Sequence, residues 1–281
     1  MGELLALGVM YGLLYGVLAL GLTLIWGVMK VVNVAHGDFV IVGAYGSYWA
    51  FTLGGLGPVE SLLVTVPLGL MLGAATYMAL IRRVENAPEL MSLLLTFGVS
   101  TLIVGLLLYF YSPTQRAIPV FLPALEASGL VFPGNVVVCA AYAVIVAILL
   151  ELFLGRTFWG KAIRAVTEDR DSSLLVGINP TKVSLLSFMI GISIATSVGS
   201  MAMLLQSVSP VNGGQFTLLS FVIVVLGGLG SPKGALVGGV LIGVINSISS
   251  IWLNAALTPV IGFMILVLVL IIRPYGLMGS K

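Results

Sequence analysis

The chain has 281 residues, of which 59% are hydrophobic and only 8% are charged, and its mean hydropathy is +1.19. Soluble domains contain about 45–50% apolar and about 25% charged residues, so this composition excludes a water-soluble protein and indicates an integral membrane protein. The single cysteine, Cys139, excludes an intrachain disulfide, and one histidine excludes a metal site of three or four His and Cys ligands. The net charge of +2 gives no indication of a nucleic-acid partner.

Long charge-free windows locate the membrane-spanning segments. Seven such windows separate the charged residues: 4–29, 39–59, 61–81, 90–115, 127–150, 183–232 and 234–272. A helix needs about 20 apolar residues to cross the hydrocarbon core, so each of the first five windows holds one span. The last two are longer, and polar stretches at Ser207–Gln215 and Asn254–Pro259 divide each into two segments. The sequence therefore predicts an all-α, polytopic helical bundle of about eight to nine transmembrane segments in a single domain, 1–281.

Two of the candidate segments are atypical. Phe216–Gly230 is short for a span, and Val31–Leu53 begins with the polar stretch Asn33–Asp38. We expect these two to be broken or re-entrant helices.

The basic residues predict the orientation of the bundle. With nine crossings and the N-terminus outside, eleven of the twelve Lys and Arg residues fall on the cytoplasmic side, where such residues concentrate. Only Arg116 falls outside. We therefore expect the N-terminus outside the cytoplasm, and the loop 155–182 and the C-terminus inside.

Glycines recur at four-residue spacing in several predicted spans. Examples are Gly8/Gly12/Gly16, Gly69/Gly73, Gly234/Gly238 and Gly239/Gly243. Small residues allow helix backbones to approach closely in lipid, so the spacing predicts a tightly packed bundle. The run Gly227-Gly228-Leu229-Gly230 before Ser231-Pro232 instead indicates a helix end in or near the membrane, where exposed backbone must line a cavity or be covered by protein.

The loop 155–182 is the one long loop on the predicted cytoplasmic side, and it holds five of the twelve basic residues. We expect a short helix in it, with Thr167 as the N-cap and acidic residues in the first turn. Gly177 and Pro180 would end this helix, and Leu174 and Leu175 would lie near its end. Such a helix is either a solvated connector or a docking element.

A partial phosphate-loop pattern lies at the start of this loop. Gly155–Lys161 matches most of it, but Ala162 stands where Ser or Thr is required, and a membrane helix rather than a strand precedes it. We interpret the match as coincidence. If ATP drives transport, another chain must use it.

The stretch Val32–Asp38 contains the single histidine, His36, and one of few acids near a span, Asp38. In one interpretation these side chains are structural, at a helix N-terminus and an interface. In the other they line a pathway, because polar groups at membrane depth usually face a cavity. Since Lys30 precedes them, we expect them at the cytoplasmic end of the second helix. A nucleophile triad is not supported, because residues two apart on a helix do not face each other.

Several motifs together resemble the permease subunits of branched-chain amino acid ABC importers. They are Gly21-Leu-Thr-Leu-Ile-Trp-Gly27, Val32-Asn-Val-Ala-His-Gly-Asp38, Ala162-Ile-Arg-Ala-Val-Thr-Glu-Asp-Arg-Asp171, Gly177-Ile-Asn179, Val225-Leu-Gly-Gly-Leu-Gly-Ser231 and Gly234-Ala235. The resemblance covers nearly the whole chain. The stretch Asp171–Gly177 also has the spacing of the Glu-Ala-Ala-x-x-x-Gly loop by which importer permeases contact their ATPases, although Asp and two serines replace Glu and two alanines.

The resemblance implies a non-enzymatic subunit of a bacterial inner-membrane importer. Its partners would be a second, related permease, two cytoplasmic ATPase subunits that use ATP and Mg, a periplasmic solute-binding protein, the amino acid substrate and membrane lipid. The chain itself would carry no cofactor. The translocation path and gate would involve Asn33, His36, Gly37, Asp38, Gly227, Gly228 and Gly230. ATPase coupling would involve Arg164, Glu168, Asp169, Asp171, Leu174, Leu175 and Gly177, with the loop helix as a coupling helix.

Other transport functions remain open at this level. Related permeases for urea, short amides or other small amino acids share these motifs, because specificity lies largely in the binding protein. An ion-coupled secondary transporter would normally carry acids within its spans, whereas all seven windows are charge-free.

Overall fold

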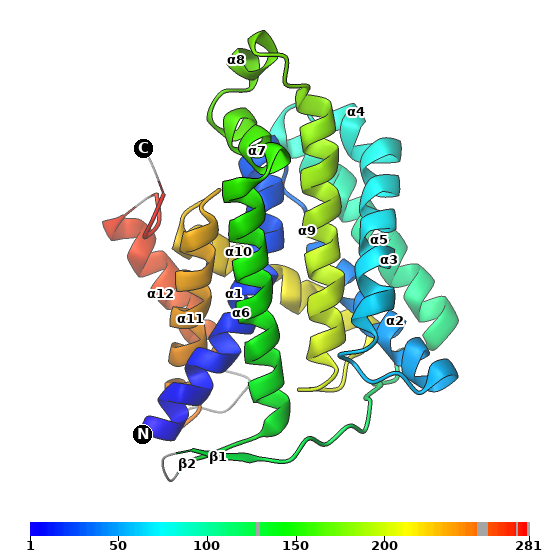
Figure 1. The fold of residues 1–281 in the computed structure, drawn as a ribbon, viewed down its shortest axis with the longest axis vertical. Helices are drawn as coiled ribbons and strands as arrows, with labels where there is room; N and C mark the ends of the chain where they lie inside the picture. The colour runs from blue at the N-terminus through cyan, green and yellow to red at the C-terminus, as the bar shows by residue number, and fades with distance from the viewer. Residues whose placement is uncertain (128–129, 252–257, 274, 280–281) are drawn as a thin grey trace.

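A computed structural model describes residues 1–281 except 128–129, 252–257, 274, 280 and 281. The chain is almost entirely helical (Figure 1), which confirms the prediction of a polytopic helical membrane protein. The helices in chain order are α1 (Gly2–Met29), α2 (His36–Gly54), α3 (Leu62–Thr76), α4 (Arg82–Val84), α5 (Glu89–Tyr111), α6 (Gly134–Arg156), α7 (Phe158–Glu168), α8 (Arg170–Leu175), α9 (Pro180–Ala202), α10 (Gly213–Gly227), α11 (Pro232–Ser249) and α12 (Thr258–Ile272).

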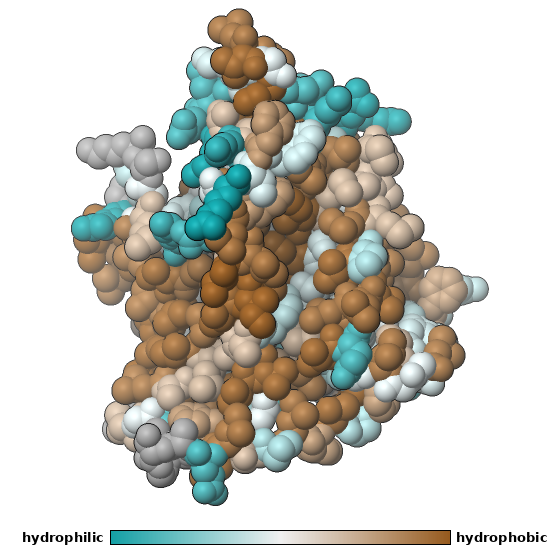
Figure 2. Space-filling view, in the orientation of Figure 1, coloured by the Kyte–Doolittle hydropathy of each residue, from teal (hydrophilic) through white to brown (hydrophobic). Residues whose placement is uncertain are grey.

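Seven helices of the described chain are long and apolar enough to cross a membrane. Two of them are composite: α3 continues through a π-helical turn, Tyr77–Ile81, into α4, and a 3-10 turn, Pro210–Asn212, precedes α10. The helix α2 and the short apolar helix α12 lie outside this set. Figure 2 shows a broad hydrophobic area across the visible face of the bundle, with hydrophilic residues gathered near α7 and α4.

The two ends of the bundle differ in structure. One end carries α7 and α8, and we call it the α7/α8 end (Figure 1). The other, the hairpin end, carries the N-terminus and an antiparallel pair of short strands, β1 (Leu125–Ala127) and β2 (Leu130–Phe132), in the register Leu125↔Phe132. Arg116 forms an isolated bridge with Val208.

Glycines bring two helix pairs into close antiparallel contact. A Cβ on Gly12 of α1 would lie 2.6 Å from the Cα of Val240 of α11, and one on Gly73 of α3 would lie 2.8 Å from the Cα of Met189 of α9. A side chain at these positions would force the backbones apart. The predicted packing role of the spaced glycines is therefore confirmed for α1 with α11 and for α3 with α9.

The two halves of the bundle repeat one arrangement with opposite direction. Long helices α1 and α9 cross where Gly21 meets Gly191, and a Cβ on either would lie within 2.7 Å of the other's carbonyl oxygen. Each is followed by a non-helical segment, then by a second helix (α2 or α10), then by a third (α3 or α11) that packs on the long helix of the other half. This is the organisation of an inverted repeat, whose interface is the usual place of a substrate site in transporters.

Candidate translocation site and coupling surface

The second helix begins deep inside the bundle. Lys30 ends α1 in the left-handed conformation, with φ 52°, and sends the chain back along the same helix. His36, the first residue of α2, donates from Nε2 to the Leu18 carbonyl at 3.0 Å. Leu18 lies eleven residues before Met29, about 16 Å along the axis at 1.5 Å per residue. The expectation that α2 begins at the cytoplasmic end of the bundle is therefore wrong.

The helix α10 begins at the same place from the opposite side. After the bridge at Val208, the chain enters the bundle through a turn capped by Ser209 and Asn212. The Thr217 hydroxyl of α10 donates to the Val34 carbonyl at 2.9 Å and accepts from the Gly37 N–H at 2.8 Å. The N-terminal ends of α2 and α10 thus meet inside the bundle, and each helix is continuous from that point.

Asp38 lies at this junction of helix ends. A Cβ on Gly213, the first residue of α10, would lie 1.9 Å from Asp38 Oδ1, so the carboxylate packs directly against the start of that helix. Both helix N-termini carry partial positive charge. This partial charge favours a negative charge on Asp38, whereas the burial of the carboxyl group opposes it.

Three polar side chains at the junction are buried and only partly satisfied. Asn33, His36 and Asp38 have 1%, 0% and 2% of their surface exposed. Within the described chain, Asn33 Nδ2, His36 Nδ1 and Asp38 Oδ2 have no hydrogen-bond partner. Unpaired buried polar atoms cost free energy of folding. These three side chains therefore contribute little to the stability of the bundle.

The glycines at the end of α10 lie elsewhere. Gly228 and Gly230 adopt positive φ values of 107° and 81°, and a Cβ on Gly227 would lie 2.2 Å from the Gly234 carbonyl oxygen. A Cβ on Gly27, near the end of α1, would lie 3.5 Å from the Cα of Gly230. The three glycines therefore build the turn between α10 and α11 near the α7/α8 end, and the structure does not bring them to the Asn33–Asp38 junction.

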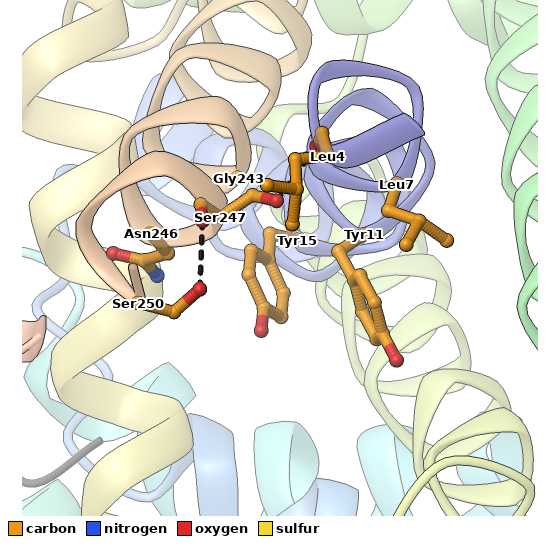
Figure 3. Close-up of a pocket in the computed structure, with 8 residues that line it drawn as sticks. All are labelled: Leu4, Leu7, Tyr11, Tyr15, Gly243, Asn246, Ser247 and Ser250. Carbon is orange, nitrogen blue, oxygen red and sulfur yellow. Dashed lines mark hydrogen bonds between the residues drawn. The ribbon is translucent and has the colours of Figure 1, made fainter. Parts of the chain in front are cut away.

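A further cavity opens between α1 and α11 (Figure 3). It has a volume of about 300 Å³, and Figure 3 shows the rings of Tyr11 and Tyr15 projecting from α1 in the same direction. The opposite wall is Gly243, Asn246 and Ser247 of α11, with Ser250 directly after that helix. This cavity was not predicted from the sequence, although two tyrosines four residues apart and an Asn within a span are signals of a polar lining.

The loop 155–182 contains two helices rather than one. Thr157 caps α7 by accepting the Gly160 N–H at 3.0 Å, and Thr167 lies inside α7 with its hydroxyl donating to the Ile163 carbonyl. Asp169 caps α8 by accepting the N–H groups of Asp171 and Ser172 at 3.0 and 3.1 Å. The prediction of Thr167 as the N-cap is therefore wrong. Hydrogen bonds from the Ser172 hydroxyl and backbone hold the pKa of Asp169 below its usual range.

The tip of α8 is an exposed apolar surface outside the spans. Leu174, Leu175 and Val176 are 56%, 88% and 74% exposed. Gly177 follows with φ 81°, which confirms it as the end of the helix, whereas Pro180 begins α9. The apex of the molecule, where Figure 1 shows α8, is hydrophobic in Figure 2. Charged residues that flank the tip and face solvent are Arg164, Glu168, Asp169 and Asp171.

The described residues offer no cluster of three His, Cys, Asp or Glu side chains that would hold a metal ion. A second cavity, of about 350 Å³, lies at the α7/α8 end between the end of α1, the turn after α4 and the start of α8. Its charged lining residues are Lys30, Glu85, Glu89, Glu168 and Arg170.

Comparison with known proteins gives one consistent family. The model of the family described as "Branched-chain amino acid transport system / permease component" matches residues 4–272. The chain is 31% identical to the permease protein LivH of the high-affinity branched-chain amino acid transport system of Salmonella typhimurium, over 97% of this chain and 93% of LivH. It is 29% identical to the permease BraD of Pseudomonas aeruginosa (97% and 94%) and 30% identical to a probable LivH of Methanocaldococcus jannaschii (96% and 90%). No solved structure matches the chain significantly.

Proposed function

Because the chain belongs to the family of branched-chain amino acid transport system permease components, we propose that it forms one side of the translocation path of an ATP-binding-cassette importer for branched-chain amino acids in the inner membrane. The path is completed by a second, related permease. Two ATPase subunits bind at the α7/α8 end and supply the energy from ATP and Mg. A solute-binding protein delivers the amino acid at the hairpin end.

The exposed tip of α8 is the observation that carries this proposal. Leu175 is 88% exposed on a helix held at one end by the Asp169 cap and at the other by the left-handed Gly177. An apolar surface kept on a rigid element outside the membrane favours a protein partner over a solvated connector. In this proposal it enters a groove of an ATPase subunit and acts as the coupling helix.

The junction of α2 and α10 is the proposed gate. Discontinuous helices whose N-termini meet at a repeat interface are the usual site of substrate passage in transporters, since their backbone donors favour carboxylates. Asn33, His36, Gly37 and Asp38 lie at this junction and are sealed in the conformation described here. Opening of the junction would expose these groups to a zwitterionic amino acid. Gly227, Gly228 and Gly230 would act only indirectly, as the turn that ends α10.

Substitution of the α8 tip tests the proposal. In proteoliposomes that contain the complete importer, we expect Leu175→Asp to abolish uptake of leucine, isoleucine and valine and the stimulation of ATP hydrolysis by the binding protein. Burial of an unpaired charge in an apolar groove costs several kcal/mol. The matched control is Leu175→Met, which keeps an apolar side chain of similar volume and should transport normally. Normal uptake by Leu175→Asp would contradict a coupling role for α8.

A further inference from the structure

One buried carboxylate joins three elements at the α7/α8 end. Glu85 follows α4, and its side chain is only 3% exposed. Its Oε1 accepts from Arg170 Nη1 at 2.7 Å and also from the Ser184 hydroxyl, and its Oε2 accepts from the Tyr77 hydroxyl at 2.7 Å. Both carboxylate oxygens are therefore engaged, by the first residue of α8, by α9 and by the π-helical turn after α3.

The π-helical turn is part of this arrangement. Tyr77 is its first residue and is 1% exposed, and its single hydroxyl hydrogen is shared between Glu85 Oε2 and the Thr181 carbonyl oxygen, which lies 3.2 Å away. Its ring packs near Phe188 of α9, with centroids 6.2 Å apart. Turns of this kind are rare and occur frequently at functional sites. The turn and Glu85 thus hold α3 and α9 together directly beneath α8.

The Glu85–Arg170 pair differs from the other ion pair of the described residues. Lys233 and Glu151 are 3.3 Å apart with side chains 77% and 68% exposed, so solvent screens them. Glu85 is shielded from solvent and Arg170 is 31% exposed. Separation of a shielded pair leaves a costly uncompensated charge. Separation of Glu85 from Arg170 is therefore more costly than separation of the exposed pair.

A continuous set of contacts leads from Glu85 to the gate. The helices α3 and α9 pack through Gly69 and Gly73. Further along, α9 packs on α2, since a Cβ on Gly199 would lie 1.9 Å from the Val40 carbonyl oxygen. The helix α2 begins at His36, within the junction.

We infer that Glu85 is a positioning residue for transport, which fixes α8 to the α3–α9 pair so that displacement of α8 by an ATPase subunit moves α9 and opens the α2/α10 junction. This inference rests on the proposed function. It assigns a role to an acid that neither binds substrate nor contacts the ATPase through the α8 tip.

The test measures the amount of amino acid taken up per ATP hydrolysed by the complete importer. For Glu85→Gln and Arg170→Gln we expect this ratio to fall about tenfold or more, as for loss of a charge-assisted hydrogen bond. Hydrolysis without binding protein and assembly with the ATPase subunits should persist. The double variant should be no worse than either single variant, because the two residues act as one unit. Arg170→Lys, which keeps the charge, should restore part of the ratio.

Glu151→Gln is the matched control, since it neutralises the exposed pair and should leave the ratio unchanged. If Glu85→Gln does not fold, Arg170→Gln and Tyr77→Phe carry the test, because both leave the carboxylate with two of its partners. An unchanged ratio in Arg170→Gln, or additive losses in the double variant, would overturn the inference. Uncoupling by Leu175→Asp alone would leave the proposed function standing, whereas normal uptake by Leu175→Asp would remove the coupling role on which both rest.

Discussion

Side chains at the α2/α10 junction combine complete burial with unsatisfied polar atoms. Asp38 Oδ2 and His36 Nδ1 lack partners among the described residues although both side chains are buried. A purely structural cap would be expected to satisfy its hydrogen bonds. In the proposed importer, we therefore expect the junction to change partners during transport.

Neutralisation of Asp38 tests this view at the level of one residue. We expect Asp38→Asn to change the uptake rate by about tenfold, since it removes a charge at membrane depth at constant shape, while docking of the binding protein is unaffected. His36→Ala should behave similarly without loss of expression. Both effects are measured by uptake and by binding-protein affinity in proteoliposomes, with the exposed acid Glu60 as control in Glu60→Gln. Wild-type uptake by both variants, or failure of both to insert, would make these residues structural.

The close approach of the α2 and α9 backbones leads to a second prediction about a single residue. Gly199→Ala would place a methyl group 1.9 Å from the Val40 carbonyl oxygen, so α2 and α9 must separate at a cost of about 1–3 kcal/mol. We expect a lower melting temperature for the purified protein in detergent. Gly98→Ala on α5 is the control, because nothing lies within 4 Å of the added Cβ and Ala favours a helix by about 1 kcal/mol. Equal melting temperatures would contradict the packing argument.

The sequence predicts which residues form the junction, but not how deep in the bundle they lie. Hydropathy and motif identify the polar stretch Asn33–Asp38, whereas its depth depends on the left-handed turn at Lys30. Nothing local requires that turn, because Lys rarely adopts positive φ. Glu85 was not recognised either, since between two apolar windows it resembled an ordinary surface acid.

The helix α8 owes its short length to defined end signals. Its stop at Gly177 was predictable, because a left-handed glycine is a common helix ending. Its start was not, because Thr167 and Asp169 are both good caps. Asp169 rather than Thr167 is the cap because α7 continues past Thr167 to Glu168. The buried residues Ala162, Ile163 and Val166 stabilise α7.

The Asp169 cap leads to a prediction about the whole of α8. In Asp169→Ala the N–H groups of Asp171 and Ser172 lose their acceptor, so α8 should fray and stimulation of ATP hydrolysis by the binding protein should fall severalfold. Asp169→Asn should retain most of it, because Asn is an equally good cap. Glu151→Ala is the control, since Glu151 is an exposed acid of α6 outside the coupling loop. If Asp169→Ala and Glu151→Ala behave alike, the cap is not what holds the coupling helix.

The same cap predicts a dependence on pH. Since the pKa of Asp169 is lower in the folded protein than in the unfolded chain, its contribution to the stability of α8 is present above the usual aspartate pKa. That contribution is lost as the pH falls through the lower, folded value. Hydrogen exchange of the Asp171 and Ser172 amides should therefore increase only in strongly acidic buffer, and not in Asp169→Asn.

For the whole molecule, the charge pattern predicts which end faces the cytoplasm. The α7/α8 end carries the loop 155–182 with its basic residues, whereas Arg116 lies at the bridge with Val208 near the hairpin end. In a Cys139→Ala background, cysteines at Ser172 and Thr114 test this, since both positions are exposed. An impermeant reagent should label only Thr114→Cys in cells without an outer-membrane barrier. Labelling of Ser172→Cys would contradict the predicted topology.

Hydropathy predicted the polytopic helical bundle, but the eight to nine predicted spans exceed the seven candidate spans of the described residues, and the pairing of the helices was not predicted. Charge-free windows identify where helices are, because lipid imposes length and composition. They do not determine that α1 packs on α11 or that α3 packs on α9, since the same glycine spacing occurs in several spans. The inverted repeat is likewise defined by the directions of the helices and by the contacts between them. It was not predicted from a repeated sequence motif.

The pairing of α1 with α11 has a consequence for biosynthesis. The helix α1 presents Gly8, Gly12 and Gly16 to α11, which leaves the ribosome later, after α2 to α10. Until α11 is inserted, this groove faces lipid or the insertion machinery. We expect chains truncated after Gly227 to insert but to remain sensitive to protease, and co-expression of a fragment that begins at Gly228 to restore resistance. The packing of α1 would then wait for the synthesis of α11.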